Sequence, residues 1–337
     1  MSETSISQNA PSKWSRRQTI KVLAATLALP LGIAGISRLG EQPSFQTWHG
    51  ESLGGPASLT LWNPNAAFAR STIARMRSEV ERLELVFSLF RHDSELSRLN
   101  QDGRLATASP DLVAVLEAAR DIAAASNGAF DPTVQPLWRL YSEHFRNQPN
   151  AISGPSALAI DGARSLVDYR QIEIGPRQVR FARPGMAVTL NGIAQGYITD
   201  RIADLLQQEG FDNSMVDVGE TRAIGGRPEG GAWTIGLKNP LNALEVNRTI
   251  AISNEAMAVS GGYGQHFPGS DLHHIFDPAS GRSAKRLLDV SVVAPRAMLA
   301  DGLSTAIFVS GEGAKASLLA LYPNTRAVLT RRDGTTA

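Results

Sequence analysis

Residues 189–197 read Thr189-Leu190-Asn191-Gly192-Ile193-Ala194-Gln195-Gly196-Tyr197, which predicts a strand that passes through a glycine turn into a helix. The strand begins at Val188. Apolar residues then recur at helical spacing up to Gly210, at Ile193, Tyr197, Ile198, Ile202, Leu205 and Leu206. Such a turn points backbone N–H groups and the positive end of the helix toward an anion. It lacks the G-x-G-x-x-G spacing of a dinucleotide-binding fold, so the stretch alone does not establish a phosphate site.

The rest of the chain mixes helices and strands. Apolar periodicity predicts helices at residues 73–87 and 111–126, and a last helix after Pro295. Two short apolar runs, at residues 171–174 and 179–181, flank Gly175-Pro176 and predict a hairpin. Further short strands are predicted at residues 57–62, 215–218, 233–237, 250–253 and 290–293. The sequence therefore predicts mixed α and β structure.

The composition is that of an ordinary globular protein and excludes several classes of function. The chain has 337 residues, of which 42% are hydrophobic and 19% charged, and its formal net charge is +1. A nearly neutral chain has no electrostatic basis for binding nucleic acid, so no nucleic-acid partner is expected. The absence of cysteine excludes disulfides, thiolate nucleophiles, cysteine-ligated zinc and iron–sulfur clusters.

The first residues, 1–34, are typical of a twin-arginine export signal. Arg16-Arg17 precedes the apolar run from Val22 to Ile36, whose about 15 residues are fewer than the roughly 20 that span a bilayer. The alternatives are an uncleaved membrane anchor and a chance arginine pair. With cleavage after Ala34, we expect a linker at residues 35–56, a domain at residues 57–330, and export to the periplasm by the twin-arginine route.

Polar clusters interrupt the packing pattern at residues 93–100, 128–133, 273–281 and 300–305. By itself the first suggests a helix cap and surface loop, and the second a turn. In the last cluster Asp301 and Thr305 are four residues apart on a predicted helix, so their oxygens share one face. This pair suits Mg²⁺, which prefers one or two carboxylates together with hydroxyl, carbonyl and phosphate oxygens. The alternative is a structural role, with Asp301 as a helix N-terminal charge. His273 and His274 lack a third ligand at zinc-like spacing.

Taken in order, these clusters resemble the ApbE family of FAD:protein FMN transferases, from roughly Leu53 to Val328. The resemblance is carried by Gly128-Ala129-Phe130-Asp131-Pro132, Gly192-Ile193-Ala194-Gln195-Gly196-Tyr197-Ile198-Thr199-Asp200, Val216-Asp217-Val218-Gly219, Ser260-Gly261-Gly262-Tyr263, His274-Ile275-Phe276-Asp277-Pro278-Ala279-Ser280-Gly281 and Ala300-Asp301-Gly302-Leu303-Ser304-Thr305. The export signal and residues 190–197 are most similar to the NosX branch, which serves maturation of the nitrous oxide reductase system.

The resemblance implies a fold and a reaction. The fold would be α+β and T-fold-like, with mixed or antiparallel sheets flanked by helices in two interlocked subdomains and FAD in the cleft between them. FAD would bind with Mg²⁺ at its pyrophosphate. A Ser or Thr hydroxyl of a periplasmic or membrane-bound flavoprotein, NosR-like for this branch, would attack the FMN-side phosphorus and AMP would leave. Phosphoryl transfer needs in-line positioning and charge neutralisation more than an enzyme nucleophile, so a chain without cysteine can perform it.

The resemblance also implies site residues. Asp301, Thr305 and the carbonyl of Gly192 would bind Mg²⁺. FAD would contact Ala129, Phe130, Asp131, Thr189, Gln195, His274 and Ile275. His274 and Asp301 would be catalytic, with His274 assisting proton or charge movement because an imidazole titrates near neutral pH.

Four residues depart from the family pattern. Thr189 replaces an acidic residue, Asn191 a glycine, Gln195 a lysine and Gly262 an aspartate. Losing one acid and one base roughly preserves the local charge, so we expect FAD binding to survive. Two alternatives to transfer stay open. The protein could be a Mg²⁺-dependent FAD pyrophosphatase, in which water replaces the acceptor hydroxyl, or an exported flavin-binding or carrier protein without turnover.

Overall fold

The computed structural model describes residues 44–63 and 65–337. Its helices are α1 (Ala66–Phe87), α2 (Glu95–Asp102), α3 (Pro110–Ala125), α4 (Gln135–Asn147), α5 (Ala157–Arg164), α6 (Ala194–Gln208), α7 (Ala297–Ser310) and α8 (Lys315–Ala320). Its strands are β1 (Ser44–Ser52), β2 (Gly55–Asn63), β3 (Arg104–Leu105), β4 (Ile172–Ile174), β5 (Val179–Phe181), β6 (Ser214–Asp217), β7 (Thr221–Ile224), β8 (Trp233–Asn239), β9 (Asn242–Ile252), β10 (Ala256–Gly261), β11 (Phe276–Asp277), β12 (Arg282–Ser283), β13 (Leu287–Ala294) and β14 (Arg326–Arg331). The expected α+β class, with antiparallel sheets flanked by helices, is confirmed.

A seven-stranded sheet organises the molecule, in the order β1-β2-β6-β7-β10-β13-β14. Every neighbouring pair in it is antiparallel. Strands β1 and β2 are joined by a two-residue turn in which Leu53 and Gly54 both have positive φ, as a tight turn matched to the twist of a hairpin requires. The Leu53 N–H donates to Glu84 Oε1 of α1 at 2.8 Å, which ties this turn to the first long helix.

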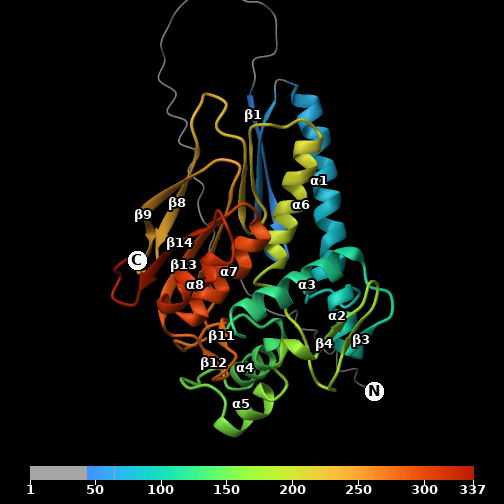
Figure 1. Ribbon diagram of the computed structural model, residues 1–337, viewed down its shortest axis with the longest axis vertical. Helices are drawn as coiled ribbons and strands as arrows, with labels where there is room; N and C mark the ends of the chain where they lie inside the picture. Colours follow the sequence, from blue (N-terminus) through green and yellow to red (C-terminus); the bar gives the residue numbers. More distant parts are fainter. Residues whose placement is uncertain (1–43, 64) are drawn as a thin grey trace, which may run out of the picture.

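The two faces of this sheet carry different layers (Figure 1). Helices α1, α6 and α7 cover one face, and the β8–β9 hairpin packs over the other. Neighbouring residues alternate between the layers: Val292 of β13 joins the helical core, whereas Val293 joins the core beneath β8 and β9. The period of two in side-chain direction therefore explains why these strands are apolar at nearly every position.

A second, mainly helical region contains α2 to α5, the small β3-β5-β4 sheet and the β11–β12 hairpin. It shares the large core with the first region through α3, which crosses α7 where Gly302 leaves no room for a side chain: a Cβ there would lie 2.3 Å from Ile122 Cδ1. Tyr197 adds a polar link, since its hydroxyl donates to Asp111 Oδ1 of α3 at 2.6 Å. The two regions are interlocked because β1, β2 and α1 precede α2 to α5 in the chain, the other strands of the large sheet follow them, and the β11–β12 hairpin then returns to the helical region.

Several elements follow the sequence prediction closely. The helix expected from residue 193 is α6, the 171–181 hairpin is β4 and β5, and the strand expected at residues 57–62 is β2. The helix expected at residues 73–87 starts earlier, at α1's first residue Ala66, because Asn65 caps it by accepting from the Phe68 N–H at 2.9 Å. The polar cluster at residues 93–100 holds the expected helix cap, Ser94, but continues into the helix α2 and not into a surface loop.

Other expectations were wrong. Residues 44–52 lie inside the expected linker at residues 35–56 but form β1, which gains its hydrogen bonds from β2 along its whole length. Residues 188–190 do not form a strand: the Asn100 side chain binds both backbone groups of Val188, at 2.6 and 2.8 Å, and takes the place of a partner strand. The helix after Pro295, α7, is followed by α8 and by the edge strand β14.

The export signal expected at residues 1–34, its cleavage after Ala34 and the linker at residues 35–43 lie outside the described residues. Within residues 44–63 and 65–337, none of the helices combines the length and the apolar character that crossing a membrane requires.

Candidate functional site

A cavity opens between the two regions and gathers most of the predicted site residues. Its walls come from α4, α7, the segments before α4 and α6, and the segment that leads into β11. Counting the solvent at its mouth, its volume is ≈ 740 Å³, within the usual size of cofactor sites. Predicted site residues in its lining are Ala129, Phe130, Asp131, Thr189, Gly192, His274, Ile275 and Thr305. The structure thus brings together groups separated by up to 176 residues in the chain, from Ala129 to Thr305; whether they contact FAD stays a prediction.

Asp131 braces the cavity wall from within. Its Oδ1 accepts hydrogen bonds from the Thr133 N–H at 2.8 Å and the Thr133 hydroxyl at 2.6 Å. Its Oδ2 accepts from the Tyr169 N–H at 3.1 Å. Burial raises the pKa of Asp131, although these hydrogen bonds favour the ionised form. The carboxylate therefore holds the 129–133 turn in place, and this bracing accounts for its position without a direct bond to a ligand.

The Thr189–Gly192 wall is held by one hydrogen bond to a distant segment and by one within the wall. The Thr189 N–H donates to the Pro132 carbonyl at 2.7 Å, and the Thr189 hydroxyl accepts from the Asn191 N–H at 3.3 Å. Gly192 permits a close approach: a Cβ there would lie 3.1 Å from Thr305 Oγ1 and 3.3 Å from the Phe130 ring, closer than most Cβ contacts. The glycine thus lets the backbone reach the hydroxyl of α7.

The sequence suggested that the backbone N–H groups at the start of α6 point toward a bound anion. Two of them instead bind groups of the protein itself. Gly196 donates to Asp301 Oδ2 at 3.1 Å, and Ala194 donates to the Leu190 carbonyl at 2.7 Å. The carboxylate of Asp301 is therefore one of the anionic groups bound at the N-terminus of α6.

The cavity's histidine, His274, has a defined tautomer. Its Nδ1 lies 3.1 Å from the Gln265 carbonyl oxygen, which can only accept a hydrogen bond. Nδ1 therefore carries the proton, and in the neutral ring Nε2 carries the lone pair. This leaves Nε2 as the atom of His274 that can take up a proton.

His273 holds the segment before β11 that carries His274. Its Nε2 donates to the Ala284 carbonyl at 2.6 Å, and its Nδ1 accepts from the Ile275 N–H at 3.3 Å. The ring also packs against Gly262, where a Cβ would lie 2.7 Å from His273 Cδ2, so the glycine that departs from the family pattern makes room for it. Burial lowers the pKa of His273 to about 4. The ring is a neutral structural group, as both nitrogens are used within the protein.

We expect this buried ring to make the protein sensitive to acid. Unfolding returns His273 to its ordinary pKa of 6.5, so the unfolded chain binds more protons between pH 6.5 and 4 and the free energy of unfolding decreases as pH falls through that window. The expected loss from this residue between pH 7 and pH 4.5 is about 2 kcal/mol. Urea unfolding of the wild type and His273→Gln at both pH values checks this. Equal losses in the two proteins would show that His273 is not the cause.

Of the residues expected to bind a cation, Gly192 and Thr305 line the cavity, whereas Asp301 does not. Thr305 Oγ1 is 3.0 Å from Ser260 Oγ of β10, which in turn lies 2.8 Å from Ser304 Oγ, so the Thr305 side chain is oriented by the Ser260 motif. Asp301, one turn earlier on α7, is buried and binds Gly196 through Oδ2. A carboxylate offers about four lone-pair sites, so this bond is compatible with coordination.

This donor set fits Mg²⁺. It consists of one carboxylate, one hydroxyl and the carbonyl of Gly192, where a Cβ would lie 3.1 Å from Thr305 Oγ1, all hard oxygen donors. Among residues 44–63 and 65–337 there is no cluster of three His, Cys, Asp or Glu side chains able to bind a metal. One carboxylate with neutral oxygens is the arrangement expected where substrate phosphates complete the coordination.

Gln195, a predicted FAD ligand, does not line the cavity. Its side chain is buried against Gly219 and Gly55: a Cβ at Gly219 would lie 2.7 Å from Gln195 Cδ. Two residues before Gly219, Asp217 is also buried, and burial raises its pKa to about 7. The Val216–Gly219 motif therefore packs against the first turn of α6 through Gln195 and is not part of the cavity wall.

Sequence reasoning missed part of the lining, namely Pro132, Val134, Trp138, Asn191, Gln265 and Phe276. Trp138 is the largest of these. The spacing of Leu137, Tyr141 and Phe145 was the available signal, because it indicates a helix whose apolar face Trp138 flanks. The spacing alone does not show whether Trp138 faces solvent, the core or a cavity.

The comparisons with known proteins agree with this geometry. The model of the ApbE family matches residues 53–329, from the β1–β2 turn to β14. The chain belongs to the ApbE family. The match includes every segment that lines the cavity.

Individual relatives extend this result. A Haemophilus influenzae protein named FAD:protein FMN transferase is 34% identical over 236 residues, covering 67% of this chain and 68% of that protein. A Vibrio cholerae protein of the same name is 31% identical over 300 residues, covering 85% and 86%. The solved structure of the flavin transferase ApbE from Vibrio cholerae superimposes with a TM-score of 0.75 at 27% identity, covering 87% of this chain and 96% of that one.

Proposed function

We propose that this ApbE protein transfers FMN from FAD to a Ser or Thr hydroxyl of a partner flavoprotein. The acceptor oxygen bonds to the FMN-side phosphorus, the bond between that phosphorus and the bridging oxygen of the pyrophosphate breaks, and AMP leaves with the bridging oxygen. The observation that carries this proposal is the convergence of Thr189–Gly192, His274 and Thr305 on one cavity, in a family whose relatives bear this activity in their names.

The chain's own residues supply positioning and one proton acceptor. His274 Nε2 would take the proton of the attacking hydroxyl, because Nδ1 is committed to the Gln265 carbonyl. Phe130, Trp138 and Ile275 would exclude water from the flavin side. Asp301, Thr305 and Gly192 would hold Mg²⁺, which when bound would neutralise charge on the pyrophosphate.

The direct test is to incubate the protein with FAD, MgCl₂ and a candidate acceptor domain and to follow two products. We expect one FMN added to the acceptor by mass spectrometry and an equal amount of AMP. An acceptor whose target Ser or Thr is replaced by alanine is the control and gains no mass. AMP formed equally with and without acceptor would instead favour the FAD pyrophosphatase. Binding of FAD with neither product would favour a flavin carrier.

We propose further that the protein is exported to the periplasm and acts, as a NosX-like member, on a NosR-like acceptor in maturation of the nitrous oxide reductase system. Support comes from Arg16-Arg17 before the apolar run and from residues 190–197. Replacing both arginines with lysine is expected to leave the protein in the cytoplasm when cell fractions are compared. Export of the double variant at the wild-type level would contradict the twin-arginine route.

A further inference from the structure

Helices α6 and α7 begin without a capping side chain of their own. The residues at their N-cap positions, Ile193 and Arg296, make no side-chain cap bond. The first N–H groups of a helix have no partner within it, and a Ser, Thr, Asp or Asn at the cap usually supplies one. In both helices the missing acceptor comes from the other helix.

Asp200 of α6 caps α7. Its Oδ1 accepts from the Ala297 N–H at 2.9 Å and its Oδ2 from the Met298 N–H at 3.0 Å, so one carboxylate binds two successive N–H groups. Asp200 is only 1% exposed. These bonds join residues 97 and 98 positions apart in the chain and determine where α7 starts relative to α6.

Asp301 of α7 in turn caps α6, because its carboxylate accepts a hydrogen bond from the Gly196 N–H in the first turn of that helix. Between the two caps the helices touch through backbone, since a Cβ on Gly196 would lie 2.3 Å from the Ala297 carbonyl oxygen. Two reciprocal caps and one backbone contact therefore determine how α7 sits against α6. The carbonyl of Gly192, just before α6, and the side chains of Asp301 and Thr305, on α7, are the oxygens assigned to the cation.

We propose that Asp200 is a positioning residue for this cation and FAD site: by capping α7 it determines the separation between Gly192 and the Asp301–Thr305 pair. This inference rests on the proposed function. Asp200 does not line the cavity, so its effect is transmitted through α7 and not through contact with substrate.

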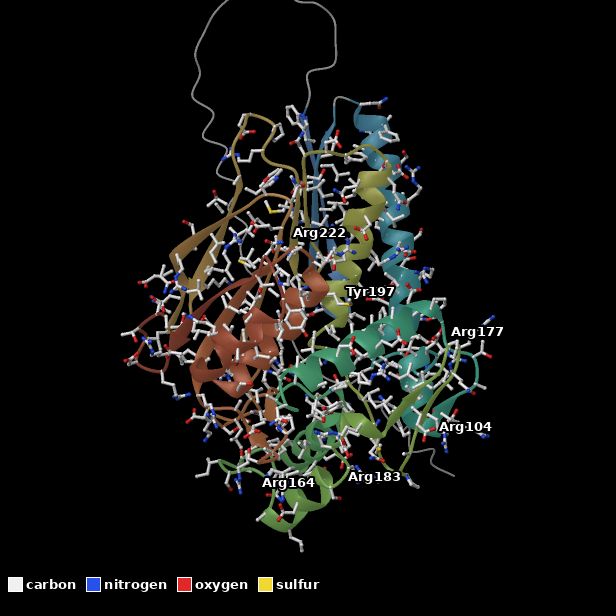
Figure 2. All side chains as sticks on the ribbon, in the orientation of Figure 1. Arg104, Arg164, Arg177, Arg183, Tyr197 and Arg222 are labelled. Atoms are coloured by element: carbon white, nitrogen blue, oxygen red, sulfur yellow. The ribbon has the colours of Figure 1, made fainter. Side chains whose placement is uncertain are left out.

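The charged neighbours of Asp200 provide a way to separate capping from charge. Arg222 NH1 lies 2.9 Å from both Asp200 Oδ1 and Asp204 Oδ1. Arg296 also reaches both carboxylates, Asp200 Oδ2 at 3.3 Å and Asp204 Oδ2 at 2.7 Å. Figure 2 shows Arg222 beside α6, farther along the helix than Tyr197. Asp204 thus shares both arginines with Asp200, whereas the bonds to Ala297 and Met298 are made by Asp200.

The test compares Asp200→Asn with the matched variant Asp204→Asn in the full chain. Asparagine keeps the shape of aspartate, but its NH₂ group cannot accept a hydrogen bond, so one of the two cap bonds is lost. FAD binding is measured by flavin fluorescence at increasing MgCl₂, and FMN transfer is measured over the same range. We expect Asp200→Asn to raise the half-saturating Mg²⁺ concentration about ten-fold in both measurements, as the loss of a helix cap predicts. We expect saturating Mg²⁺ to restore most of kcat.

Asp204→Asn is expected to change the half-saturating concentration less than about three-fold, because it weakens the two ion pairs of a partly exposed carboxylate and removes no cap. A purely structural effect would lower the amount of folded protein and leave that concentration unchanged. If Asp200→Asn does not fold, Asp200→Glu, which retains both acceptor oxygens on a longer side chain, takes its place with the same expected direction.

Equal shifts in the Asp200 and Asp204 variants, or no shift in either, would overturn the positioning proposal while leaving the proposed function intact. Wild-type protein that binds FAD without any effect of Mg²⁺ would overturn the positioning proposal together with the assigned cation site. Absence of both FAD binding and FMN transfer in the wild type would contradict the proposed function itself.

Discussion

Replacing Asp301 with asparagine is expected to lower the rate of FMN transfer at least about 100-fold at millimolar Mg²⁺. Asp301 is the single carboxylate of the donor set around Thr305 and Gly192, so the variant loses the only formal negative charge that these residues offer to a cation. Transfer is measured as AMP released and as FMN added to the acceptor. The effect is expected at every FAD concentration, because it acts on charge that must be neutralised during reaction.

Asparagine is chosen because Asp301 has a second role as the acceptor for the Gly196 N–H. An amide oxygen can still accept that hydrogen bond, so Asp301→Asn keeps the cap while removing the charge. Asp301→Ala removes both and is expected to lose activity and also to unfold at lower urea concentration. Full activity in Asp301→Asn together with a loss in Asp301→Ala would mean that Asp301 acts only as a cap.

Replacing Gly196 with alanine is expected to cost about 3 kcal/mol or more in the free energy of unfolding. The added Cβ would lie 2.3 Å from the Ala297 carbonyl oxygen, 2.6 Å from its carbonyl carbon and 2.7 Å from Met298 Cα. These are backbone atoms and cannot rotate away, so α6 and α7 must separate. The preference of helices for alanine over glycine, about 1 kcal/mol, opposes the effect and is too small to cancel it.

Gly162→Ala is the control for this experiment. Gly162 also lies in a helix, α5, but a Cβ there would meet nothing within 4 Å. This variant is expected to be as stable as the wild type or up to about 1 kcal/mol more stable. Urea unfolding followed by circular dichroism compares the two. If Gly196→Ala unfolds at the wild-type urea concentration, the close crossing of α6 and α7 is not rigid.

Local patterns in the chain were sufficient for much of the fold. The spacing of Ile198, Ile202 and Leu206 places one buried stripe on α6, and such a stripe depends only on the helical period. The Gly175-Pro176 turn likewise predicts the β4–β5 hairpin from adjacent residues. The motifs around Phe130, Gly192, His274 and Thr305 gather at one cavity, as their shared resemblance to the ApbE family implied.

Contacts between distant segments decided the rest. Val188 looks like part of a strand, but it is paired by the Asn100 side chain, 88 residues away. Gln195 belongs to a motif that borders the cavity, yet its side chain packs against Gly219 and does not line the cavity. The reciprocal caps of Asp200 and Asp301 join residues about 100 positions apart. Periodicity and turn chemistry describe neighbours in the chain, whereas such caps exist only once packing has brought two helix ends together.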